Sequence, residues 1–169
     1  CFFTYLVVIL LTLLFVLINP LQDSKLIKDN MTLVTSIAIQ KGGVAKTTTS
    51  IALAAGIAKK GHKTLLIDID PQANASTVVL KGYESLRKEN TLYATIMDRL
   101  SLPIYNTTTP NLSVTPSHIL LADADIALTN ALDNRVARLK NALNEIKDQY
   151  EYVFIDCPHN LGWLTLNAL

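Results

Sequence analysis

A lysine, glycines and a run of threonines follow an apolar segment near the beginning of the chain. The residues from Ile37 to Ser50 read IAIQKGGVAKTTTS. Glycines let the backbone approach a ligand closely, and the backbone N–H groups at a helix N-terminus bind phosphate oxygens. A lysine neutralises phosphate charge, and a hydroxyl binds the metal ion that accompanies a nucleotide. The spacing therefore indicates a nucleotide triphosphate site that includes Lys46 and Thr47.

The loop departs from the common pattern G-x-x-x-x-G-K-[ST] at both glycine positions. Gln40 stands at the first and Ala45 at the second. Ala45 needs a backbone conformation that accepts a Cβ atom, so the affinity for nucleotide stays open at this stage. The residues expected to contact the cofactor are Lys41, Gly42, Gly43, Val44, Ala45, Lys46, Thr47 and Thr48.

Two apolar runs end in aspartates. Thr64 to Ile69 reads as a buried parallel strand that carries Asp68 and is followed by Asp70, and the run ending at Ile155 is followed by Asp156. The carboxyl ends of parallel strands meet at one edge of a sheet, where ligands of open α/β sheets bind. We therefore expect the aspartates to lie beside the phosphates. The alternative for the first pair is two solvated aspartates in a turn before a proline.

The segment KGGVAKTTT resembles the deviant phosphate loop of the ParA/MinD group of ATPases, and DIDPQAN and PSHILLADADIALT resemble its ParA branch. The resemblance runs over nearly all of residues 31–169. It implies an α/β fold, a three-layer P-loop NTPase with a mostly parallel, doubly wound sheet, and ATP with Mg²⁺ as cofactors. It also implies a homodimer, a ParB-like partner protein, nonspecific DNA binding and a cytoplasmic, nucleoid-associated location.

The resemblance also implies roles for single residues. Lys41 would reach across the dimer to the phosphates of the other subunit, although a surface lysine beside a glycine turn is the plain alternative. Lys41, Lys46 and Asp70 would be catalytic, with Asp70 orienting the attacking water. Thr47, Asp68 and Asp156 would form the metal site, with Asp68 in a supporting role. His159 replaces a proline of the family pattern and is interpreted as a tolerated loop residue.

Two other functions stay open. A MinD-like, membrane-cycling ATPase shares the loop, and a remnant that binds no nucleotide belongs to a different class. An iron–sulfur relative is disfavoured, because Cys157 is the single cysteine of the domain and no metal-ligand spacing accompanies it. The chain has 15 basic and 14 acidic residues, so its bulk charge gives no indication of nucleic-acid binding.

Residues 1–30 form an apolar extension that is interpreted as a transmembrane segment or an artefact of the gene model. The apolar stretch within residues 1–18 reaches the lower length of a membrane-spanning helix. Met31 lies where relatives of this kind begin, and the preferred reading is that the domain of residues 31–169 starts there. If the apolar segment is genuine, the protein is tethered to a membrane. We also expect the domain to be truncated at its C-terminus, with an unpaired strand edge.

The remaining sequence predicts ordinary α/β elements. Helices are expected over residues 47–60, 91–100, 119–132 and 135–150, a loop over 101–110 and a strand over 111–115. Ser117 is the expected N-cap of the third helix. In the last helix Val136, Leu139, Leu143 and Ile146 form an apolar face. Arg135 and Arg138 are interpreted as solvated charges, with a partner or DNA as the alternative.

Overall fold

The computed structural model describes residues 32–40, 43–131 and 134–169 of the 169-residue chain. The predictions for residues 1–30, for the start at Met31, and for Lys41 and Gly42 lie outside these ranges. None of the helices within the described ranges combines the length and hydrophobicity that crossing a bilayer requires.

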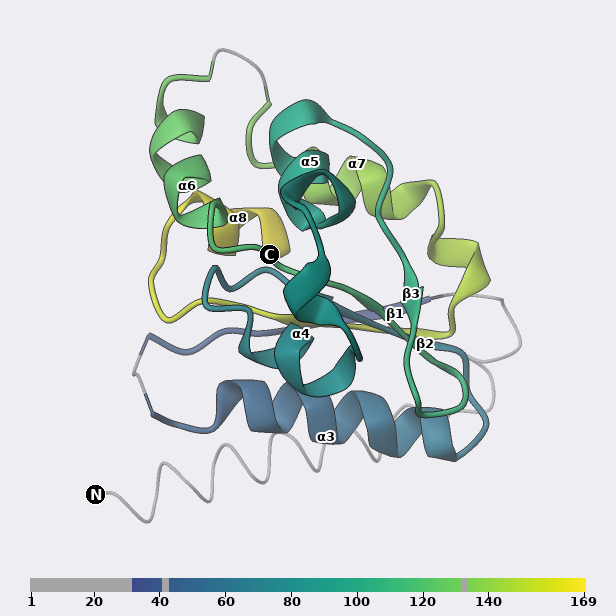
Figure 1. Cartoon of the computed structure of the whole chain (residues 1–169). Coiled ribbons are helices and arrows are strands. Elements are labelled where there is room, and N and C mark those ends of the chain that lie inside the picture. The colour runs from purple at the N-terminus through teal and green to yellow at the C-terminus, as the bar shows by residue number, and fades with distance from the viewer. Residues whose placement is uncertain (1–31, 41–42, 132–133) are drawn as a thin grey trace. The chain divides into compact units, whose positions relative to one another are not determined.

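Five strands form one sheet in the order β1-β5-β2-β4-β3 (Figure 1). They are β1 (Leu33–Ile37), β2 (Thr64–Asp68), β3 (Tyr105–Asn106), β4 (Leu112–Thr115) and β5 (Tyr152–Asp156). All neighbouring pairs are parallel except β3 and β4. β2 and β5 are buried at every residue, as expected for central strands covered on both faces. The predicted mostly parallel sheet is confirmed.

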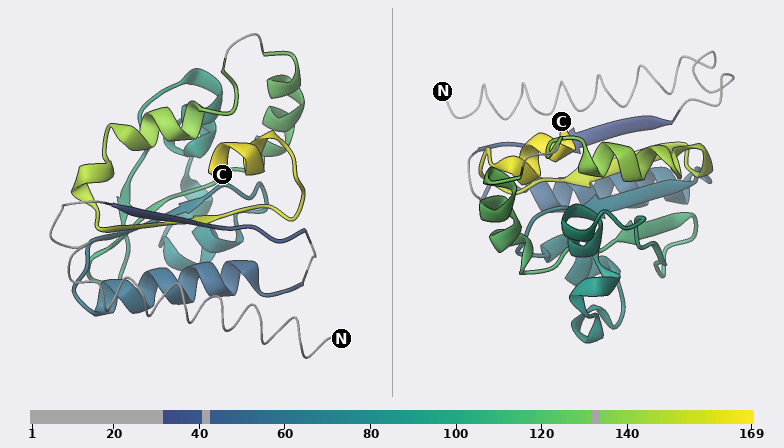
Figure 2. Two further views of the ribbon diagram at one scale, coloured as in Figure 1. Left: turned by 180° about the vertical axis from the view of Figure 1, so that it is seen from behind. Right: turned by 90° about the horizontal axis from the view of Figure 1, so that it is seen from above.

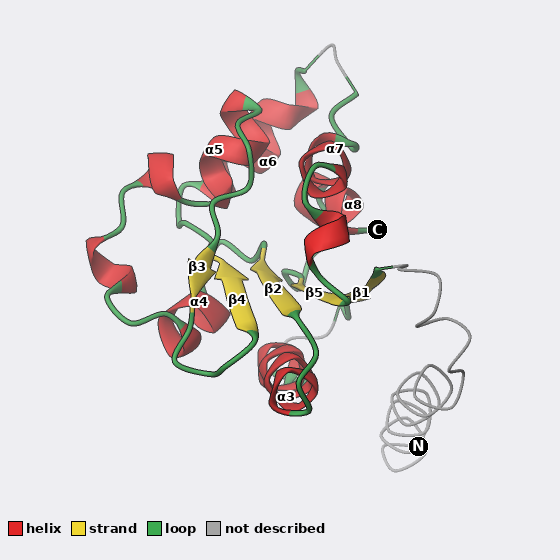
Figure 3. Ribbon diagram, turned by 90° about the vertical axis from the view of Figure 1, so that its right-hand side faces the viewer, coloured by secondary structure: helices red, strands yellow, loops and turns green. Residues whose placement is uncertain are grey.

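Helices cover both faces of the sheet, so the predicted three-layer, doubly wound architecture is confirmed (Figures 1 and 3). One layer holds α3 (Lys46–Lys59) and α4 (Asn74–Val79). The other holds α5 (Leu92–Asp98), α6 (Leu121–Thr129), α7 (Arg138–Asn144) and α8 (Trp163–Ala168). Figure 2 shows the same layers from behind and from above. Three short 3₁₀ turns, η1 (Tyr83–Ser85), η2 (Lys88–Asn90) and η3 (Lys147–Gln149), complete the described elements.

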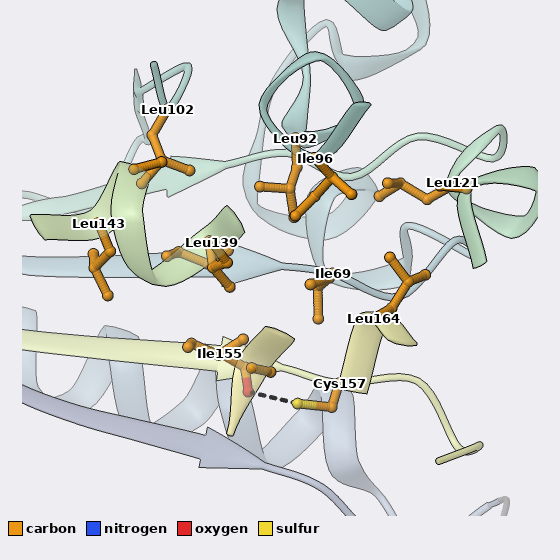
Figure 4. Close-up of a cluster of buried hydrophobic side chains, with 14 of the residues drawn as sticks. Ile69, Leu92, Ile96, Leu102, Leu121, Leu139, Leu143, Ile155, Cys157 and Leu164 are labelled. Atoms are coloured by element: carbon orange, nitrogen blue, oxygen red, sulfur yellow. Dashed lines mark hydrogen bonds between the residues drawn. The ribbon is translucent and has the colours of Figure 1, made fainter. Parts of the chain in front are cut away.

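The main core lies between the sheet and the second helical layer (Figure 4). Alternate strand residues such as Leu65, Ile67 and Ile155 point into it, because successive side chains of a strand lie on opposite faces. The helices contribute leucines and isoleucines that are almost fully buried, and burying one such side chain stabilises the fold by about 1.5–3 kcal/mol. The helical members labelled in Figure 4 are Leu92, Ile96, Leu121, Leu139, Leu143 and Leu164.

β1 is an outer strand of the sheet. Within the described residues it pairs with β5 alone, and its Leu33 and Val34 side chains are 38% and 44% exposed. An exposed edge of this kind, carrying apolar side chains, is a template for pairing with another strand. The unpaired strand edge expected from a truncated domain stays a prediction.

Three boundary predictions were wrong. The predicted loop 101–110 contains β3, which pairs with β4 through a turn that Asn111 closes with a φ of 62°. The predicted helix 119–132 is α6 over the shorter range Leu121–Thr129. The predicted helix 135–150 is divided into α7 and η3. Here the side chain of Asn167 accepts hydrogen bonds from the backbone N–H groups of Arg138 and Leu139, which sets the start of α7.

The proposed roles of three side chains were also wrong. Ser117 does not cap α6, because its hydroxyl donates instead to the backbone carbonyl of Asp70 at 2.6 Å. Arg135 is not a freely solvated charge: its guanidinium lies 4.1 Å from the centre of the Trp163 ring and donates to the last carbonyls of α6. Arg138 donates to the carbonyl of Ile96 in α5 at 2.6 Å. Both arginines thus satisfy carbonyls at helix C-termini.

Candidate nucleotide site

The loop after β1 leads directly into α3. Gly43 has a φ of +69°, a conformation that glycine adopts readily, and Ala45 has a φ of 61° as the residue before the helix. Ala45 thus occupies the left-handed region, which costs a residue with a Cβ about 1–2 kcal/mol. The helix that follows begins at Lys46, and its first N–H groups are directed at the loop. Thr47 is half-buried and Thr48 is exposed in this first turn.

The carboxyl ends of β2 and β5 bring two of the predicted aspartates together. Asp68 and Asp156 are direct partners in the parallel register, and both are fully buried. Ile37 at the end of β1 is the partner of Asp156 on the other side, so the phosphate loop begins next to this carboxylate. The expectation that these aspartates lie at the loop's edge of the sheet agrees with this register.

A side chain of α3 binds the carboxylate of Asp156. Ser50 donates a hydrogen bond of 2.8 Å from its hydroxyl to Oδ1 of Asp156. Burial raises the pKa of Asp156, while the hydrogen bond from Ser50, the nearby hydroxyl of Thr47 and the charge of Lys46 act to lower it. The other oxygen, Oδ2, is buried and has no hydrogen-bond partner among the described residues. An unpartnered buried carboxylate oxygen beside a threonine hydroxyl suits a hard cation such as Mg²⁺, which takes oxygen ligands.

Ser50 was not among the residues singled out from the sequence. The signal was present, because Ser50 follows Lys46 by four positions and Thr47 by three, and such positions share one face of a helix. A face that carries a lysine and two hydroxyls toward a strand end is unusual for a core-facing helix. The side chain of Lys46 is only 9% exposed, and its charge lies close enough to Asp156 to act on the pKa of that carboxylate.

The carboxylate of Asp68 accepts hydrogen bonds from nearby residues of the chain. Its Oδ2 accepts hydrogen bonds from the backbone N–H and the hydroxyl of Ser76, at 2.8 and 2.7 Å, and Oδ1 accepts from the N–H of Asp70 at 3.2 Å. Burial is the main cause that raises the pKa of Asp68 to about 7, against these hydrogen bonds. Each carboxylate oxygen of Asp68 therefore accepts at least one hydrogen bond from within the chain.

Asp70 lies two residues after Asp68, in the loop that follows β2, and is less buried than Asp68. Its Oδ1 accepts from the N–H of Gln72 at 3.0 Å, and its carbonyl accepts from the N–H of Ala73 at 2.9 Å. Its charge is among the causes that raise the pKa values of both Asp68 and Asp156. Asp70 therefore lies at the same edge of the sheet as these two carboxylates.

The loop after β5 carries Cys157 and His159. Burial raises the pKa of Cys157 to about 12, so the thiol stays protonated and packs as a small apolar residue. Its Sγ lies 3.8 Å from the carbonyl of Ile155 (dashed line in Figure 4). The side chain of His159 is exposed. The loop ends at Gly162, where a Cβ atom would lie 1.9 Å from the Asp125 carboxylate that accepts from the N–H of Leu164.

Within the described residues, no group of three or more His, Cys, Asp or Glu side chains could hold a metal ion. The metal set predicted from the sequence includes a threonine and two aspartates, and a site of this kind relies on phosphate oxygens and water for its other ligands. The arrangement of Thr47 and Asp156 fits such a site, because one carboxylate oxygen is left unpartnered.

Residues 32–169 match the AAA domain family. The chain is 46% identical over 136 residues to the sporulation initiation inhibitor protein Soj of Bacillus subtilis, covering 79% of this chain and 53% of that protein. It is 42% identical over 135 residues to the chromosome partitioning protein ParA of Myxococcus xanthus, covering 79% and 47%. The chain therefore spans about half the length of the curated relatives it matches.

Solved structures with similar folds include nucleotide complexes. Cobyrinic acid a,c-diamide synthase from Mycobacterium smegmatis with bound ADP and magnesium aligns with a TM-score of 0.76 and 33% identity, covering 82% of this chain and 56% of that chain. A putative plasmid partition protein from Borrelia burgdorferi bound to AMPPNP aligns with a TM-score of 0.71 and 27% identity, covering 81% and 57%.

Proposed function

The chain belongs to the AAA domain family of ParA/Soj-type partition ATPases, and we propose that it binds ATP with Mg²⁺ between the β1–α3 loop and the ends of β2 and β5. One observation carries the proposal. The buried carboxylate of Asp156 accepts a hydrogen bond from Ser50 in α3 and keeps its second oxygen unpartnered, next to the first turn of that helix. The solved structures of the diamide synthase with ADP and magnesium and of the plasmid partition protein with AMPPNP support the same assignment.

Each residue of the site then has a distinct task. The backbone from Gly43 to Thr48 would bind phosphate oxygens through N–H groups, with Lys46 neutralising their charge. Thr47 and Asp156 would hold Mg²⁺, which neutralises charge on the phosphate oxygens during transfer to water. Asp68 would have a supporting role beside the metal site, next to Asp156, its partner in the register of β2 and β5. Asp70 would orient the attacking water.

We propose further that ATP binding closes two copies of the chain into a homodimer. In this dimer Lys41, which lies outside the described residues, would contact the phosphates bound by the other copy. A cation supplied in trans stabilises charge on the transferring phosphoryl group, as arginine fingers do. Such an ATPase would work as a switch in DNA segregation, with nonspecific DNA and a ParB-like protein as partners and a cytoplasmic, nucleoid-associated location.

The dimeric mechanism is tested by light scattering of the full chain with Mg²⁺ and a non-hydrolysable ATP analogue. Wild type should change from monomer to dimer on addition of the analogue, and Lys41→Ala should remain monomeric while still binding nucleotide. Lys59→Ala, a substitution at the exposed end of α3, is the matched control and should dimerise. Dimerisation of Lys41→Ala to the wild-type extent would overturn the role of the lysine in trans.

A further inference from the structure

Four residues from three separate segments form a closed ring of hydrogen bonds beside the proposed site. Starting at the end of β2, the N–H of Asp70 donates to Asp68, and Asp68 accepts from the hydroxyl of Ser76 at the start of α4. The same hydroxyl of Ser76 accepts from the N–H of Ser117 at 2.9 Å. The hydroxyl of Ser117 donates to the carbonyl of Asp70 at 2.6 Å, which closes the ring.

Both serines are fully buried, and both hydroxyls donate a hydrogen bond within the ring. Ser76 and Ser117 have no exposed surface. The Ser76 hydroxyl donates to a carboxylate and accepts from an N–H at the same time, which a hydroxyl can do and an alanine, valine or lysine side chain cannot. Buried polar groups that are all satisfied in one network hold a single arrangement of the chain. The four hydrogen bonds of the ring therefore act together to hold one arrangement of these segments.

The ring fixes the backbone of Asp70 on both sides. Its N–H is held by the Asp68 carboxylate and its carbonyl by the hydroxyl of Ser117, while the N–H of Gln72 binds its side chain. The ring also extends beyond the site. The carbonyl of Pro116, next to Ser117, accepts from the N–H of Leu92 at the start of α5 at 2.8 Å. The position of Asp70 is thus set by α4 and by the loop that precedes α6.

We propose that Ser76 and Ser117 are positioning residues for ATP hydrolysis, which hold Asp70 in the place from which it orients the attacking water. The inference rests on the proposed function. The serines would contact neither phosphate nor metal, and they act through Asp68 and Asp70. Their removal should therefore slow the hydrolytic step and leave nucleotide binding by the β1–α3 loop in place.

The test compares Ser117→Ala and Ser76→Ala with wild type by steady-state ATP hydrolysis and by titration with a fluorescent ATP analogue. We expect kcat to fall about tenfold or more, because a small displacement of a positioning group is costly, while KM and the Kd of the analogue change by less than about threefold. Ser117→Thr restores the hydroxyl and should recover most of kcat. Ser85→Ala in η1, where the hydroxyl is exposed and binds only the local Gly82 carbonyl, is the matched control.

A second measurement makes no use of hydrolysis. Hydrogen exchange at the backbone N–H groups of residues 70 and 117 reports the ring directly, and both alanine variants should lose protection there.

Wild-type kcat together with wild-type protection in Ser117→Ala would overturn the inference. Parallel losses of kcat, of affinity and of thermal stability would overturn it too, in favour of a purely structural role. If wild type binds no nucleotide while the exchange result is as expected, the proposed function is wrong, but the hydrogen-bond ring is confirmed as a structural feature. Should Ser117→Ala not fold, Ser117→Cys, with its weak donor, takes its place.

Discussion

The hydroxyl of Ser50 donates to Oδ1 of Asp156 over 2.8 Å, and the Oδ2 atom of the same carboxylate is buried without a hydrogen-bond partner in the described part of the chain. A buried carboxylate with one oxygen unsatisfied destabilises a protein unless a cation or donor arrives. This pair therefore joins α3 to the end of β5 and leaves Oδ2 available to a cation or a hydrogen-bond donor.

Asp156→Asn should separate metal binding from folding. Burial raises the pKa of Asp156, which means that the folded protein disfavours its charge. We expect the variant to melt at the same or a higher temperature than wild type without ligands, since the buried charge is gone. Addition of Mg²⁺ and ATP should raise the melting temperature of wild type and not that of the variant. Equal stabilisation of both proteins by Mg²⁺ and ATP would remove Asp156 from the metal site.

Ala45→Gly should relieve backbone strain. The φ of 61° destabilises the folded state by about 1–2 kcal/mol when the residue is alanine. Glycine removes this strain, but its greater conformational freedom stabilises the unfolded state by about 0.4–1 kcal/mol. The free energy of unfolding, measured with urea, should stay equal or rise by about 1 kcal/mol. Ala52→Gly on the exposed face of α3 is the control and should lose about 1 kcal/mol. Equal losses in both variants would show that Ala45 is not strained.

The contribution of Asp68 to the free energy of unfolding should fall as the pH rises from about 4 to 7. The pKa of Asp68 is raised from 3.8 to about 7, mainly by burial. Between these values the folded state keeps a proton that the unfolded state has released, so unfolding becomes easier with rising pH. The contribution of Asp68 is at most roughly 4 kcal/mol. Urea unfolding at pH 5 and pH 8 should show a smaller difference for Asp68→Asn than for wild type. Identical differences would contradict the raised pKa.

Thr115→Val should stabilise the protein by about 1 kcal/mol. The hydroxyl of Thr115 is fully buried in β4 and has no hydrogen-bond partner within the described residues, whereas valine has nearly the same shape and no polar atom to bury. Thr95→Val is the matched control, because the equally buried hydroxyl of Thr95 donates to the carbonyl of Ser101 at 3.1 Å. It should lose about 1 kcal/mol in the same urea experiment. A loss of similar size at Thr115 would reveal a partner for its hydroxyl.

The sequence predicted the parts of the fold that depend on strong local patterns. Continuous apolar runs around Leu66 and Phe154 identified the central strands, and an alanine-rich segment after Lys46 identified α3. Because parallel strands end at one edge, Asp68 and Asp156 could be placed together before their register was known. These predictions needed only chain direction and hydrophobic periodicity.

The parts that failed depend on contacts between distant segments. Ser117 has the residue type and position of a helix N-cap, yet the carbonyl of Asp70, 47 positions earlier, binds its hydroxyl. The start of α7 is set by the side chain of Asn167, and Arg135 stacks on Trp163. Pattern reasoning treats each segment by itself, so it cannot identify a side chain that is used by another element. The same limit explains why Ser76, which binds Asp68 and Ser117, was overlooked.

The most direct test of the account is calorimetric titration of the full chain with ATP in the presence of Mg²⁺, repeated with Lys46→Gln. Glutamine places a neutral polar side chain, shorter by one atom, in the 9% exposed position of Lys46 and so removes the charge. We predict saturable binding of one ATP per chain to wild type and at least about tenfold weaker binding to the variant, since a phosphate loses a charge-assisted contact. No saturable binding to the folded wild type, or equal affinity in both proteins, would contradict the assignment of a nucleotide site.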